Sequence, residues 1–201
     1  MVSSMDEILP NAIELWALLF LCENDRIRIR EFFARDWDID RRFILREMHI
    51  SVYHAQREMP GLASIVEPVR IILPAAETRF MTFAPGGLEP TPEIIPGEKK
   101  VGIRVHGKSA ALPAILALRK RLLAHESAEM LGERFPSTMR KSAFGRRSFE
   151  PHMALLRAGS GITSDLRAVG AAFRQKLDEL VFDRFEIRIR QGRRTVFSAR
   201  Q

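Results

Sequence analysis

Short segments with a two-residue period, in which apolar side chains alternate with polar or small ones, limit what this chain can fold into. In residues 100–106, Val101, Ile103 and Val105 alternate with polar or small residues, as in a strand with one buried face. Similar segments lie at 48–52, 151–155, 185–190 and 195–199. The last two flank a short polar turn and indicate a hairpin.

Helices are predicted between these strands, without a regular strand–helix alternation. Ser109 is a suitable N-cap for an amphipathic helix that ends near Ala124, and residues 165–180 have the same 3.6-residue period. Residues 12–22 indicate a buried strand, although their ambiguous period also allows a short helix. A further helix begins at Asn24 or Asp25. This order predicts an α+β fold with antiparallel sheets.

The chain divides into two similar halves around a segment rich in proline and glycine. Residues 69–73 and 78–84 indicate two strands joined by a short turn, and residues 85–98 indicate a loop. We interpret this loop as the point where the chain crosses between the halves. Residues 1–201 then form one bilobed domain, with two lobes related by a pseudo-twofold axis around a central groove.

The composition of the chain limits the cellular compartments and the binding partners to be expected for this protein. The 201 residues carry a formal net charge of +7, which favours anionic partners such as nucleotides or RNA. The single cysteine, Cys22, excludes an internal disulfide framework and suits a reducing compartment. No basic region opens the N-terminus, and the apolar run at 15–22 is shorter than the ~20 residues of a membrane helix. A cytoplasmic protein without a membrane partner is expected.

Two of the alternating segments share one chemical pattern, about a hundred residues apart. The first is Met48-His49-Ile50-Ser51-Val52 and the second is Pro151-His152-Met153-Ala154-Leu155. Residues i and i+2 of a strand share a face, so each histidine projects together with the small residue that follows it. Side by side, two such strands form a cleft that holds a general base and a general acid.

These segments resemble the 2H phosphoesterase superfamily, which includes the 2′-5′ RNA ligase-like proteins and cyclic nucleotide phosphodiesterases. The family signature is a pair of His-x-Thr/Ser-x motifs on strands. His49-Ile50-Ser51-Val52 matches it fully, and His152-Met153-Ala154-Leu155 matches it except for Ala154. The lead-in Phe149-Glu150-Pro151 is also similar to that of the family. The resemblance implies a bilobed α+β fold with both motifs lining the groove.

The resemblance also implies roles for these residues. His49 and His152 become an acid/base pair, and Ser51 donates a hydrogen bond to phosphate oxygens. The implied reaction opens a 2′,3′-cyclic phosphate on a nucleotide or an RNA end, without a metal or other cofactor. Which histidine is the base stays open, as do ligation against hydrolysis and the oligomeric state.

Further residues are weaker candidates for contacts with the substrate. Tyr53 has the strand parity of His49 and Ser51, so it either flanks the groove or packs with only its hydroxyl at the surface. His54 has the opposite parity and is expected to pack or cap the strand end. Arg157 follows the second motif, but strict alternation turns it to the buried face unless a bulge intervenes. A basic loop, with Arg140, Lys141, Arg146 and Arg147, is able to follow an RNA backbone.

Ala154 leaves two alternatives open. It lacks the hydroxyl that the family places there, and loss of such a donor commonly lowers a rate about a hundredfold. The chain is then either a phosphoesterase with an altered second motif or a non-catalytic module that binds RNA or nucleotides. A third possibility is a structural α+β domain whose histidines are incidental.

Overall fold

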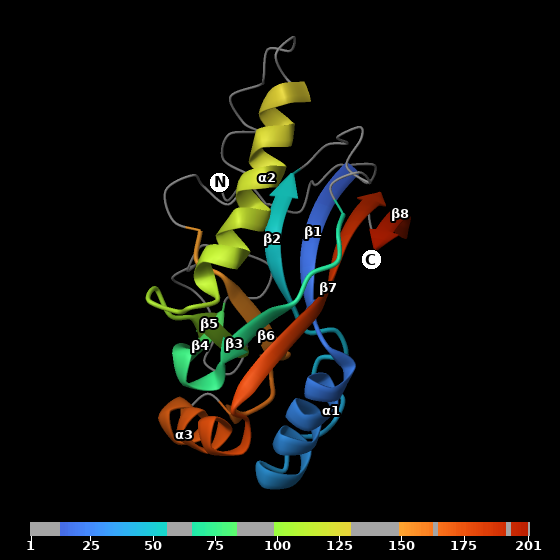
Figure 1. Ribbon diagram of the computed structural model, residues 1–201. Coiled ribbons are helices and arrows are strands. Elements are labelled where there is room, and N and C mark those ends of the chain that lie inside the picture. The colour runs from blue at the N-terminus through green and yellow to red at the C-terminus, as the bar shows by residue number, and fades with distance from the viewer. Residues whose placement is uncertain are drawn as a thin grey trace, which may run out of the picture.

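The chain folds around a single antiparallel sheet, as seen in a computed structural model that describes residues 13–55, 66–83, 99–129, 149–162, 165–191 and 194–200 (Figure 1). The strands are β1 (Ile13–Leu21), β2 (His49–Ala55), β3 (Ile71–Pro74), β4 (Thr78–Phe83), β5 (Lys100–Val105), β6 (His152–Leu156), β7 (Glu179–Gln191) and β8 (Arg194–Arg200). The helices are α1 (Glu23–Glu31), which continues into a π-helical turn at Phe32–Asp36, α2 (Leu112–Glu129) and α3 (Leu166–Lys176).

The strand order is β3-β7-β1-β2-β6-β5-β4, and β8 also pairs with β7. Every pairing between these strands is antiparallel. The predicted α+β class with an antiparallel sheet is therefore confirmed, as is the C-terminal hairpin, formed by β7 and β8.

The sheet curls, because β3 and β4 lie at its opposite edges and are joined only by the turn Ala75–Glu77. Three intervening residues span no more than roughly 14 Å. The chain thus crosses from one side of the sheet to the other at this turn, where the Ala75 N–H donates to the Asp178 carbonyl (2.9 Å). The expected crossing at 85–98 is wrong in position: that segment joins the neighbouring strands β4 and β5, and residues 84–98 lie outside the described part of the chain.

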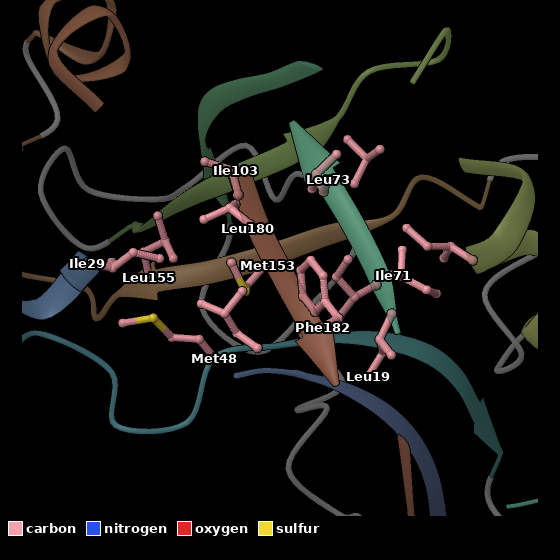
Figure 2. Packing of buried hydrophobic residues seen from close by; sticks show 14 of the residues in the cluster. Leu19, Ile29, Met48, Ile71, Leu73, Ile103, Met153, Leu155, Leu180 and Phe182 are labelled. Atoms are coloured by element: carbon pink, nitrogen blue, oxygen red, sulfur yellow. The ribbon is translucent and has the colours of Figure 1, made fainter. Parts of the chain in front are cut away.

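The hydrophobic core occupies one face of the sheet and includes side chains from all three helices. Figure 2 shows how side chains from β3 and β7, such as Leu73 and Phe182, gather with Met153 of β6. Phe173 of α3 packs edge-to-face against Phe32 (5.5 Å between ring centroids) and Phe80 of β4 (5.1 Å). The opposite face of the sheet carries the histidines.

Both histidine strands contain a register shift at the same position. Opposite β1, Ser51 pairs with Leu18 and Tyr53 with Ala17, so that Val52 is skipped. Opposite β5, the pairing likewise skips one residue, Leu155. The skipped residue stands three positions after the histidine in each strand, so the pair β1–β2 repeats the local geometry of the pair β5–β6.

Gly102 allows the second of these bulges to form. A Cβ atom at this position would lie 2.2 Å from the Met153 carbonyl oxygen and 2.8 Å from the Ala154 Cα. Both atoms belong to the backbone of β6, so that neither can move aside without displacing the strand that bears His152.

We expect Gly102→Ala to lower the free energy of unfolding by about 3 kcal/mol, since overpacking against a backbone is costly. Urea denaturation measures this loss. Gly107→Ala is the matched control, because a Cβ there meets no atom within 4 Å. Equal stability of the two variants would contradict the close approach of β5 to β6.

Candidate functional site

The two histidine strands are neighbours in the sheet. β2 and β6 run antiparallel and are in register at Ile50 and Met153, which are both buried. One residue further along, this register sets Ser51 opposite His152; in the other direction it sets His49 opposite Ala154. All four lie on the face away from the core. The charge on His152 also influences the pKa of His49.

His49 lies in a largely desolvated position. Its ring is tilted against that of Phe20, with 5.3 Å between centroids. Its Nδ1 is buried and has no hydrogen-bond partner among the described residues. The pKa of His49 is lowered to about 4, chiefly by burial; Arg188 and His152 act in the same direction, and Glu47 and Glu186 oppose the shift. The imidazole is therefore neutral at physiological pH.

A charged network beside His49 is centred on Arg188 of β7. Its guanidinium donates to both carboxylate oxygens of Glu47 (2.8 and 3.0 Å) and to both of Glu186 (2.7 and 3.2 Å). The Ser198 hydroxyl donates a further hydrogen bond to Glu186 (2.6 Å). The hydrogen bonds from Arg188 hold the pKa of the Glu47 carboxyl below its usual value, and, against the effect of burial, those from Arg188 and Ser198 lower the pKa of Glu186. Both carboxylates thus remain ionised and fix the guanidinium in place.

A cavity of about 310 Å³ opens next to this network. It is lined by Trp16, Leu18, Glu47, His49, Arg188, Arg190 and Thr195. The guanidinium groups of Arg184 and Arg188 lie over the Phe20 ring, 4.2 and 4.8 Å from its centroid. His152 is not part of this lining, so the cavity adjoins only one of the two histidines.

His152 is oriented by its own backbone neighbourhood. Its Nδ1 lies 2.9 Å from the Glu150 carbonyl oxygen. A carbonyl only accepts, so that Nδ1 carries the proton and Nε2 is the atom that exchanges protons. The Phe83 ring stacks on the imidazole, with centroids 4.7 Å apart and planes 26° from parallel.

The expectation for Tyr53 is wrong, because the bulge at Val52 reverses the alternation that follows. Tyr53 is fully buried in the core. His54 instead comes to the histidine face, where its ring stacks on Trp16 (3.8 Å between centroids). Burial lowers the pKa of His54.

Arg157 stands five residues after His152, the position that His54 occupies relative to His49 in the first motif. The bulge at Leu155 leaves both Leu155 and Leu156 buried, and Arg157 is exposed just beyond the strand. Because neighbouring residues point in opposite directions, Arg157 turns away from the core that holds Leu156. Ser51 is partly exposed, whereas the basic residues Arg140, Lys141, Arg146 and Arg147 lie outside the described part of the chain.

Sequence reasoning missed the charged residues that surround the histidines. On β7, charges recur at every second position from Arg184 to Arg190, which by itself indicates only a strand. The same two-residue spacing also predicts that these four charged side chains lie on one face of the strand, and this was the signal available in the sequence. The pairing of Arg188 with Glu47, distant in sequence, was not visible.

The described residues contain no group of three His, Cys, Asp or Glu side chains that is able to hold a metal ion. No helix among them is long and apolar enough to cross a membrane. No protein-family model matches the chain, and no curated protein matches it significantly.

The depressed pKa of His49 predicts a specific dependence of stability on pH. The unfolded chain takes up a proton near pH 6.5, but the folded protein does so only near pH 4. Stability is therefore lost as the pH falls through this interval, by roughly 3 kcal/mol from this group. Urea denaturation at pH 7 and pH 4 measures the loss. His49→Gln is the comparison protein, because it lacks the group but keeps every other titrating side chain; identical losses in both proteins would refute the assignment.

Proposed function

We propose that this chain is a metal-independent phosphoesterase of the 2H type, which opens 2′,3′-cyclic phosphates on nucleotides or RNA ends. One observation carries the proposal: two strands, each with a histidine followed by a small residue at i+2, pair side by side with both motifs on the face away from the core. The matching bulges in the two strands give further support, because they make the halves locally equivalent.

The surroundings of the two histidines support a division of labour. His49 is neutral above pH 4 and is therefore ready to accept a proton. His152 holds its Nδ1–H on the Glu150 carbonyl, which leaves Nε2 as the ring nitrogen for proton transfer. In this assignment His49 is the general base and His152, in its imidazolium form, is the general acid.

The reaction then runs as a hydrolysis. The oxygen of a water molecule bonds to phosphorus while His49 takes its proton. The bond between phosphorus and one ribose oxygen breaks, and His152 gives its Nε2 proton to that oxygen. Ser51, opposite His152 in the extended register, donates to a non-bridging oxygen where negative charge accumulates. The negative charge of the bound phosphate raises the basicity of His49.

A second candidate is a binding module for RNA or nucleotides without turnover. The observation that favours it is Ala154, which stands opposite His49 in the same extended register and offers no hydroxyl. Binding without hydrolysis distinguishes this candidate from the first.

Hydrolysis of 2′,3′-cyclic AMP and of an RNA end that carries the cyclic phosphate tests the proposal, with a chelator present. We expect His49→Ala and His152→Ala each to lower kcat/KM at least a hundredfold, since each removes one proton transfer. His106→Ala is the matched control, because His106 is exposed in the turn before α2. An inert wild-type protein that still binds these ligands would establish the binding module instead.

A further inference from the structure

Two arginines extend the histidine face of the sheet beyond His152. Arg104 of β5 is the direct cross-strand partner of His152, and Arg79 of β4 is the direct partner of Arg104. Directly paired residues point to the same side of a sheet. Phe80, next to Arg79, is buried in the core, whereas Phe83 of the same strand stacks on His152. Both arginines therefore share the face of His152.

In the cross-strand row formed by His152, Arg104 and Arg79, positive charge exceeds negative charge. Like charges directly opposite each other in a sheet are destabilising. Glu150 forms an ion pair with Nη2 of Arg104, and Arg79 has no ion pair with another described residue. The Arg104 side chain is 40% exposed, so that its remaining N–H groups are accessible. An anion bound between the two guanidinium groups would relieve their repulsion.

This row also lies next to Ala154, where the second motif lacks the hydroxyl that would donate a hydrogen bond. Ala154 pairs with Gly102, so neither strand provides a polar side chain at that position. The next pair on the same face is His152 with Arg104. On the β5 side of Ala154, the guanidinium of Arg104, at the end of a long side chain, is thus the first donor available near the position of the missing hydroxyl.

Glu150 connects this arginine to the histidine. Its carboxylate holds Arg104, and its backbone carbonyl accepts the Nδ1–H of His152. The two groups are therefore oriented by one residue, which fixes the guanidinium relative to the imidazole Nε2.

We propose that Arg104, assisted by Arg79, binds the non-bridging phosphate oxygens in place of the hydroxyl that is absent at Ala154. This assignment rests on the proposed phosphoesterase function and adds to it a catalytic residue outside both motifs. Arg104 contacts the phosphate directly, and Arg79 neutralises its outer charge.

The test is a double-mutant cycle on the hydrolysis of 2′,3′-cyclic AMP. Arg104→Gln is expected to lower kcat/KM about a hundredfold, and Arg104→Lys less, because it keeps the charge but not the planar set of donors. Ala154→Thr restores a hydroxyl. We expect it to change the wild-type enzyme by less than about threefold but to raise kcat/KM of the Arg104→Gln enzyme about tenfold or more. Equal effects of Ala154→Thr in both backgrounds would overturn the proposal.

Arg167→Gln is the matched control, since Arg167 is exposed on α3. A thermal melt of each variant identifies any loss of folding, and the Arg104→Lys enzyme serves where Arg104→Gln does not fold. Binding of 2′-AMP, followed by calorimetry, separates this proposal from the proposed function. If the wild type shows no turnover, weaker 2′-AMP binding by Arg104→Gln still supports the phosphate site, and unchanged binding refutes it.

Discussion

The contact between β2 and β6 is the interaction on which the candidate site depends. Ile50 and Met153 form the register pair between these strands, and both side chains are buried in the core. The residues on either side of this pair, including His49 and His152, consequently point to the opposite face. Apolar packing on one side of the sheet thus determines which polar groups meet on the other.

The electrostatics of the face differ between its two ends. Around His49 the charges are paired: Arg188 is held by Glu47 and Glu186, and desolvation keeps the imidazole neutral. Around His152, among the described residues, the two cations Arg79 and Arg104 accompany the carboxylate of Glu150. The paired charges around His49 suit a residue that accepts a proton, and the excess positive charge around His152 suits an anionic substrate.

Much of the fold was predictable because single strands and helices have local signals. The alternation in residues 100–106 corresponds to β5, and Ser109 caps the turn that leads into α2, accepting a hydrogen bond from Ala111 N–H (3.1 Å). The burial of Tyr53 was not predicted, since alternation assumes an unbroken ladder. The adjacent apolar pairs Val52-Tyr53 and Leu155-Leu156 were the available clue, because two consecutive inward residues require a bulge. The partners of Arg188 and Arg104 depend on long-range pairing, which one sequence does not reveal.

The order of strands in the sheet has a consequence for how the chain is made. β1 lies between β2 and β7, so the first of the described strands pairs with one that is made much later, after β2 to β6. β4, β5 and β6 are in contrast contiguous in both the sheet and the chain order. On the ribosome, this later-made part has all its own strands before β7 emerges, while apolar β1 still lacks one neighbour. β1 thus keeps one unpaired edge until β7 has been made, and that edge needs protection in the nascent chain.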